Sequence, residues 1–426
     1  MTFSRGLVGL AIVGCSHAIA DADAQTARPP SSGLQATGNF YGGYDTPLFD
    51  NTSTNAFNPT GQGFGGGDVN VDYFRPGRRV ALGTAVIASN RYYPGSTPST
   101  APAYVASLSL SSVSRGRWSW VLGQYAQYAP LSAATLFAGG AANPSQGGTL
   151  SAAILAGSTN FQISTIRQVD INTAGNVAYS VNRRTQVSLS TIVGTQLQID
   201  STQPNAVRYD ARVRLSREVR RSLRVFAGYG LSEVRVPAQG ATPKSASRID
   251  GYDLGIDFSK PFQLTRNTTI GIQTGVVKVP NAGRSEFTAV GAANLDYKVT
   301  RSWSAQLAAT RDARFVQAYR NAVVFSGVSV SLGGQVATRL GATLNANYSK
   351  GRINIAPTPI EFDSASTSAR LRYDVTRTAG LFAEYSLFRS SFDASSSLSG
   401  YPTGAFGRHG VRAGLTLGVS PFSRRP

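Results

Sequence analysis

The feature of this chain that most constrains its fold is an alternation of apolar and polar residues with a period of two. Successive side chains of a β-strand point to opposite faces, so this pattern predicts strands with one apolar and one polar face. The segments are longer than the five or six residues usual for a soluble strand, and they suit a wall between lipid and water. One such run is Val187, Leu189, Thr191, Val193, Thr195, Leu197 and Ile199.

Similar polar turns separate the alternating segments. The clearest copies are residues 297–303 (YKVTRSW) and 373–379 (YDVTRTA), with a looser copy at 179–185 (YSVNRRT). Weaker relatives lie around Arg115, Arg220, Arg266 and Arg339, so the turns recur about every 36 to 44 residues, with one gap near twice that. A repeated strand–turn–strand unit predicts an antiparallel meander of long strands.

Composition excludes two broad classes of protein. Charged residues make up only 15% of the chain and hydrophobic residues 41%, which excludes a highly charged disordered protein. The mean hydropathy of −0.11 excludes a bundle of membrane helices. No segment approaches the roughly 20 consecutive apolar residues that a membrane helix needs, so a membrane form of this chain must be a barrel.

The first 24 residues have the features of a secretory signal peptide. Arg5 precedes an apolar stretch from Gly6 to Cys15, and the small-x-small sites 18–20 (AIA) and 22–24 (ADA) follow. A second interpretation is a lipoprotein signal at 12–15 (IVGC), which would make Cys15 a lipidated N-terminus. The two ordinary cleavage sites favour the first interpretation.

The segment 25–77 is rich in Gly, Asn, Pro and Thr and has no sustained periodicity, so we expect a flexible periplasmic segment. It is too short for the plug of a TonB-dependent receptor, and that class is set aside. We expect the barrel at 78–422 and a short tail at 423–426. The long segment 129–172 is expected to be an outer loop, with one more hairpin as the alternative.

The fold class predicted is all-β, a transmembrane up-and-down antiparallel β-barrel of about 16 strands, or 18 if the segment 129–172 is a hairpin. Short turns such as 299–302 are expected on the periplasmic side, and longer segments such as 236–247 and 390–407 on the outer side of a Gram-negative outer membrane. The sixteen strands are expected at 78–90, 103–113, 117–128, 172–182, 185–199, 206–217, 222–235, 248–259, 266–278, 286–299, 302–313, 322–335, 339–350, 365–375, 378–389 and 408–420.

The turns of the Tyr-x-Val-Thr-Arg type, with strands such as 381–385 (LFAEY), resemble those of the β-barrel porin 2 family of bacterial outer-membrane proteins. The resemblance covers residues 78–422. It implies an outer-membrane barrel and a link with exopolysaccharide export, in which periplasmic export components would be partners. The last strand resembles the terminal signal read by the barrel assembly machinery, although Pro421 displaces Phe422 from the alternating set.

The net charge of +19 implies an anionic partner. Lipopolysaccharide phosphates, acidic solutes and acidic polymers are candidates, whereas a signal peptide and a lipid-facing alternation argue against nucleic acid. One group of arginines marks the short turns, where we expect them to anchor the periplasmic rim and meet lipid phosphates. This group is Arg115, Arg117, Arg183, Arg184, Arg217, Arg220, Arg221, Arg301, Arg339 and Arg377.

A second group of arginines occupies the alternate strand positions that face the water-filled side of the barrel. The pore-lining candidates are Arg208, Arg212, Arg214, Arg370 and Arg372, together with the inward aromatic residues Tyr125 and Phe382. These arginines either form an electropositive pore wall that attracts anions or pair across strands with carboxylates. The candidate carboxylates are Asp210, Asp253, Asp257, Asp296, Asp374 and Glu384. The excess of arginine slightly favours anion selectivity.

The aromatic residues near predicted strand ends are expected to form girdles at the two membrane interfaces. They are Trp118, Trp120, Trp303, Tyr104, Tyr209, Tyr297, Tyr348 and Tyr373. Catalysis is not expected, because His17 lies in the signal peptide and His409 is the one remaining histidine. No cofactor or metal site is expected either. We therefore predict a pore for hydrophilic, anionic solutes or exopolysaccharide, with a structural or adhesive barrel as the alternative.

Overall fold

The computed structural model describes residues 33–46, 61–94, 100–112, 116–132, 162–199, 205–220, 223–238, 245–257, 262–265, 267–281, 284–300, 302–316, 321–353, 360–392 and 404–419. Within these ranges no helix is long and apolar enough to cross a membrane. The predicted signal peptide and the tail at 423–426 lie outside them.

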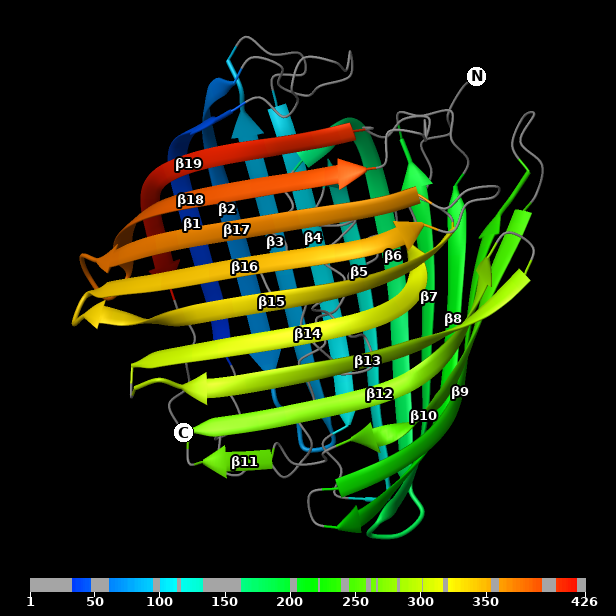
Figure 1. The fold of residues 1–426 in the computed structure, drawn as a ribbon. Helices are drawn as coiled ribbons and strands as arrows, with labels where there is room; N and C mark the ends of the chain where they lie inside the picture. Colours follow the sequence, from blue (N-terminus) through cyan, green and yellow to red (C-terminus); the bar gives the residue numbers. More distant parts are fainter. Residues whose placement is uncertain are drawn as a thin grey trace.

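The described chain forms one closed, antiparallel β-barrel (Figure 1). Each strand pairs with its neighbours in sequence, and β1 pairs with β19 to close the wall. The short β11 lies on the same side of β12 as β10 does, so the wall has eighteen strand positions. The strands are β1 (Gly33–Asp45), β2 (Gln62–Arg75), β3 (Val80–Tyr92), β4 (Thr100–Ser112), β5 (Trp118–Ser132), β6 (Gln162–Ser180), β7 (Thr185–Gln198), β8 (Ala206–Arg220), β9 (Leu223–Val236), β10 (Ser245–Asp257), β11 (Phe262–Thr265), β12 (Thr268–Asn281), β13 (Arg284–Lys298), β14 (Trp303–Val316), β15 (Asn321–Ala337), β16 (Leu340–Ile353), β17 (Ile360–Asp374), β18 (Ala379–Phe392) and β19 (Gly404–Val419).

The expectation of a flexible segment at 25–77 is wrong for residues 33–45 and 62–75, which are the wall strands β1 and β2. The alternation was not recognised in β2 because glycines occupy several of its outward positions. Residues 63, 65 and 67 of β2 are glycines on the lipid-facing parity, so the apolar half of the alternation is missing from the sequence there. Because β1 and β2 belong to the wall, the described residues between 33 and 75 form no separate plug domain.

The sixteen predicted strands are all present, as β3–β10 and β12–β19. The alternative count of eighteen is right, but the additional pair is β1 and β2 rather than a hairpin in 129–172. β5 pairs directly with β6, so no strand comes between them in the wall. The connection at 133–161 lies outside the described residues.

The outer surface of the barrel carries an apolar band. On β17, for example, Leu371 and Tyr373 are exposed on one parity, whereas Arg370 and Arg372 occupy the other. Outward charges gather toward the long-loop ends of the strands, as for Arg235, Arg248, Lys350, Glu361 and Arg389. A closed wall with an apolar outer band and a polar inner face spans a membrane, because every strand edge is paired inside it. The chain is therefore a barrel of the outer-membrane kind.

The aromatic girdles are present at both ends of this band. Trp118 packs against Tyr179 near the short turns, with ring centroids 4.6 Å apart. Near the long loops, Tyr104 stacks on Tyr128 at 5.8 Å. Exposed Tyr209, Tyr229, Tyr252 and Tyr348 extend the outer girdle, and exposed Tyr297 and Tyr373 extend the inner one.

The arginines of the short turns lie at one rim, as predicted for those that the structure describes. Arg117, Arg183, Arg184, Arg339 and Arg377 are all exposed there. Arg115, Arg221 and Arg301 are not among the described residues. Contact of this rim with lipid phosphates stays a prediction.

The seam between β1 and β19 depends on a close backbone approach. The two strands pair in register from Ala36↔Val419 to Asp45↔Gly410. A Cβ atom added at Gly414 would lie against the carbonyl oxygen of Phe40 and 2.7 Å from the Cβ of Tyr41. Glycine at position 414 therefore allows β1 to reach the pairing distance.

We predict that Gly414→Ala weakens the seam, while Gly418→Ala on the same strand and face does not. A Cβ at Gly418 meets nothing within 4 Å. Overpacking of a fitted site costs about 1–3 kcal/mol, so the free energy of unfolding falls by that amount for Gly414→Ala. Urea titration of the heat-modifiable gel mobility of each variant measures the difference. Equal stabilities of the two variants would contradict this account of the seam.

Candidate functional site: the charged inner wall

The predicted pore-lining arginines lie on the inner face of the barrel. On β8, Arg208, Arg212 and Arg214 alternate with Tyr209 and Val213, which are exposed on the outer surface. Arg370 and Arg372 have the same inward parity on β17. Because β8 and β18 are opposite each other in the wall, the arginines of β17–β19 face those of β8 across the lumen.

The arginines of β8 are held by neighbours on the inner wall. The Nε atom of Arg208 lies 2.6 Å from Oδ2 of Asp210, and Ser232 also donates a hydrogen bond to Asp210. The guanidinium of Arg214 stacks over the ring of Phe226 at 4.2 Å. One ion pair therefore holds Arg208 and one stacking contact holds Arg214.

A buried ion network crosses the seam near the long-loop end. Asp45 at the end of β1 accepts hydrogen bonds from Arg408 of β19 and from Tyr93, the latter at 2.9 Å. Arg91 of β3 lies 3.6 Å from the same carboxylate and 4.7 Å above the ring of Phe64. The charged side chains are at most 3% exposed. One carboxylate thus joins the first strand, the last strand and β3.

A second group continues the network toward the middle of the wall. Arg412 donates to both carboxylate oxygens of Glu384 at 2.9 Å and lies 3.7 Å from Asp68. Arg370 lies 3.9 Å from Glu384 and stacks over Phe382 at 4.3 Å. Two guanidiniums therefore share the carboxylate of Glu384.

The two predicted inward aromatics have different surroundings. Phe382 is only 4% exposed, beneath Arg370 and beside Tyr41, so it supports a guanidinium and has little free surface for a solute. Tyr125 is partly exposed on the inner face, and its hydroxyl donates to Gln127. Contact of Tyr125 with a passing solute stays a prediction.

The inner charges largely balance among the described residues. Of the pairings predicted across strands, Arg370–Glu384 is confirmed. Asp210 and Asp374 pair instead with Arg208 and Arg372 two residues away on their own strands. The side chains of Asp253 and Asp257 are not among those that the structure describes. The inward arginines are Arg91, Arg208, Arg212, Arg214, Arg224, Arg370, Arg372, Arg408 and Arg412, and the inward carboxylates are Asp45, Asp68, Asp72, Asp170, Asp210, Glu218, Glu286, Asp296, Asp312, Asp374 and Glu384.

The excess positive charge is therefore concentrated elsewhere, and the short-turn rim holds much of it. This rim exposes Arg75, Arg78, Arg79, Arg117, Arg183, Arg184, Arg217, Arg220, Lys298, Arg339 and Arg377. The net charge of the chain was a poor guide to the lumen because composition does not separate the rim from the inner face.

Exposure of the inner wall changes along its length. At the short-turn end, Arg372 and Asp374 lie 2.8 Å apart and are 48% and 47% exposed. At the long-loop end, inward Ile353, Phe362 and Phe388 are at most 4% exposed. The inner wall is therefore accessible to water at the short-turn end, whereas at the long-loop end both apolar side chains and the charges around Asp45 are buried.

A polar cluster on β5–β7 was missed by the sequence reasoning. Gln168 donates to Asp170 at 2.9 Å and accepts from Gln196 at 2.8 Å, and Gln127 lies opposite Asp170 in the strand register. All four side chains are at most 8% exposed. Asp170 forms no ion pair within the part of the chain that the structure describes. The alternate placing of Gln and Asp on these strands could predict that their side chains point inward. It could not predict that these side chains are buried.

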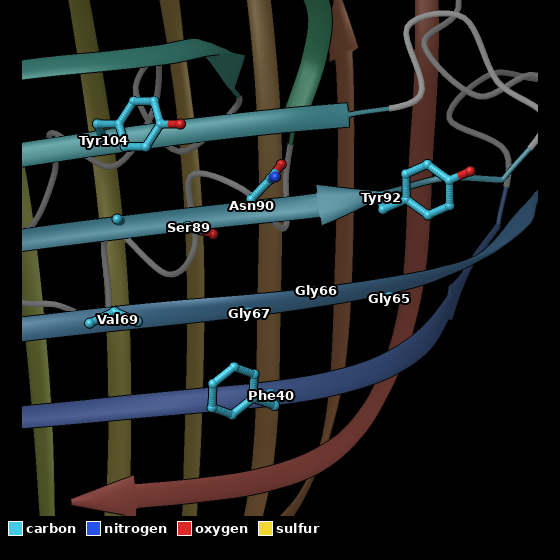
Figure 2. Close-up of a pocket in the computed structure, with 10 residues that line it drawn as sticks. Phe40, Gly65, Gly66, Gly67, Val69, Ser89, Asn90, Tyr92 and Tyr104 are labelled. Atoms are coloured by element: carbon cyan, nitrogen blue, oxygen red, sulfur yellow. The ribbon is translucent and has the colours of Figure 1, made fainter.

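A hollow of about 450 Å³ lies on the lipid-facing side of β1–β4 (Figure 2). Gly65, Gly66 and Gly67 form its floor, and Phe40 and Tyr92 flank it. Because Phe40 and Tyr92 are exposed on the outer surface, this hollow is separate from the lumen.

The surroundings of His409 differ from those of a hydrolase histidine. Its Nδ1 atom lies 2.6 Å from the hydroxyl of Tyr385, on the outward parity of β18 and β19, and no serine takes that position. Among the described residues, no three His, Cys, Asp or Glu side chains gather as metal ligands do.

Comparison with known proteins gives no family for this chain. No family model matches the sequence, and no curated protein matches it. Among solved structures, similar ones include the siderophore receptor PirA from Pseudomonas aeruginosa, with 8% identity and a TM-score of 0.44 over 92% of this chain and 81% of that chain. Another is the ferric-catecholate import receptor Fiu from E. coli K12, with 10% identity and a TM-score of 0.37 over 92% and 82%. These likenesses are too distant to carry a conclusion about function.

We predict opposite effects for two buried aspartates. Asp45→Asn leaves Arg91 and Arg408 without their shared carboxylate, and loss of one partner of a buried pair costs about 3–5 kcal/mol. Asp170→Asn removes a buried charge that has no cationic partner in the described chain, so the free energy of unfolding stays equal or rises. Urea titration of the two variants tests this contrast. A stable Asp45→Asn barrel would show that the seam network contributes little.

Proposed function

We propose that this protein is an outer-membrane conduit for hydrophilic solutes. The observation that carries the proposal is the inner face, which presents charged and polar side chains from the exposed short-turn end as far as the buried network around Asp45. An eighteen-position barrel is wide enough to enclose an aqueous channel. A polar inner face is the expected lining of a water-filled path.

Selectivity of the conduit is proposed to be weak and to favour anions. The lumen contributes little net charge, because arginines and carboxylates alternate along it. The arginines of the short-turn rim surround the periplasmic entrance, where a field of one sign raises the local concentration of anions. An acidic exopolysaccharide is one such solute, and the resemblance of the turns to the β-barrel porin 2 family is what suggests it.

The proposed partners follow from the surfaces of the barrel. Outer-membrane lipids and lipopolysaccharide would contact the apolar band and its charged borders. The barrel assembly machinery would recognise β19, and export components would bind at the periplasmic rim.

The alternative is a structural or adhesive barrel without an open channel. The apolar filling of the outer mouth favours it, since a side-chain-filled barrel conducts nothing. The two functions differ in one observable, the passage of ions.

We expect purified protein in planar bilayers to show intermittent channels with a weak anion preference. In the triple variant Arg208→Ser, Arg212→Ser and Arg214→Ser, inward carboxylates such as Asp210 lose their partners, so the reversal potential under a salt gradient shifts toward cation preference. Lys350→Ser on the outer surface is the matched control and leaves the potential unchanged. A folded barrel that never conducts would exclude the conduit.

A further inference from the structure

The wall separates between β13 and β14 at their outer ends. β13 pairs with β12 along its whole length, from Thr268↔Tyr297 to Asn281↔Arg284. Its pairing with β14 extends only from Lys298↔Ser304 to Gly291↔Arg311. β14 in turn pairs with β15 to its very end, at Val316↔Asn321. The ends of β14 and β15 therefore leave the plane of β13 together, as one hairpin.

The outer ends of β14 and β15 pack inside the barrel. Phe315 and Val324 have the parity of the lipid-facing residues Leu307 and Val328, yet they are 1% and 6% exposed. They belong to an apolar cluster with inward residues of β8, β9, β10 and β12. Its members are Ala206, Val234, Val236, Ile249, Val277, Val279, Ala313, Phe315, Ala322 and Val324.

Two distances show how far the wall bends at this point. β9 and β14 are four positions apart, which is about 19 Å along a wall with strands spaced about 4.8 Å. Their Cα atoms nevertheless approach within 8 Å, as do those of β10 and β15. The hairpin end thus crosses the mouth and covers part of it.

Polar contacts hold the hairpin end against the inner face of β8 and β13. Arg352 of β16 lies 2.6 Å from Glu286 of β13, although three strand-to-strand steps separate their strands. Arg208 of β8 donates to the carbonyl oxygen of Phe315 at 3.5 Å. The first contact is partly exposed, with side chains 33% and 45% accessible, so it stabilises the arrangement only modestly.

We propose that the outer ends of β14–β16 form a gate, with the Glu286–Arg352 ion pair as its latch. The gate turns where the β13–β14 pairing stops, at Gly291 and Arg311. In the closed state the hairpin end and the apolar cluster cover part of the mouth, and in the open state the hairpin end returns toward β13. This inference rests on the proposed conduit function, because a gate needs a path to close.

The test measures thiol labelling and conductance of the same variants. Ala322 is 2% exposed within the cluster, so Ala322→Cys reports opening by its reaction with a membrane-impermeant maleimide. A Cys15→Ser background removes the one native thiol. The full-length protein is reconstituted in liposomes for labelling and in planar bilayers for current, and heat-modifiable mobility confirms that each variant is folded.

Arg352→Gln should raise the labelling rate and the open fraction about threefold to fivefold, as expected for loss of a partly exposed ion pair. Phe315→Ala should raise both more than tenfold, because it opens a cavity in the cluster. Arg235→Gln is the matched control, since it breaks the exposed Arg235–Glu233 ion pair on the outer surface of β9, outside the gate, and should change neither.

Labelling rates equal to those of the parent in both gate variants would overturn the gate. If Phe315→Ala does not fold, Arg352→Gln decides alone. Faster labelling without current in any variant would support the movement and overturn the conduit function.

Discussion

Closure of the wall between the first and last strands is the constraint on which the rest of the structure depends. In lipid an unpaired strand edge leaves backbone groups without hydrogen-bond partners, so β19 must meet β1 along the membrane-spanning length. The side chains beneath this seam reinforce it. Asp45 of β1 binds Arg408 of β19 and lies near Arg91 of β3, so a single carboxylate fixes strands from both ends of the chain. These charges are stable in a buried site because each has a partner.

The distribution of charge separates structural from functional roles. Inward arginines are paired or stacked, and they hold the inner wall in place while keeping it polar. The rim at the short turns exposes eleven described arginine and lysine side chains, and it surrounds the entrance that the proposed function assigns to a periplasmic solute. At the other end apolar side chains and the charges around Asp45 are buried, so passage through the proposed conduit would be controlled there. These three regions together support the proposed conduit, with weak selectivity and a closed outer mouth.

Much of the fold could be predicted from period-two alternation, because the lipid-facing and water-facing sides impose it on each strand. β1 and β2 could not, since glycines at 63, 65 and 67 remove the apolar half of the pattern. Parity also placed Arg208 and Arg370 inward correctly. The partners Asp45 and Arg408 could not be matched from the sequence, because their contact exists only after closure joins residues far apart in the chain. The fold-over of β14 and β15 was missed because Phe315 and Val324 keep the lipid-facing parity while packing inside.

The most direct test of closure is a disulfide across the seam. Gly42 and Ala413 are register partners on the outward parity of β1 and β19, so cysteines placed there face each other. Oxidation of the Gly42→Cys, Ala413→Cys protein in outer-membrane fractions is predicted to give an intramolecular crosslink, and the mismatched pair Gly42→Cys, Val419→Cys is predicted to give none. A folded barrel that forms no crosslink at 42 and 413 would mean that the wall closes through β3 and β19, with the first two strands outside it.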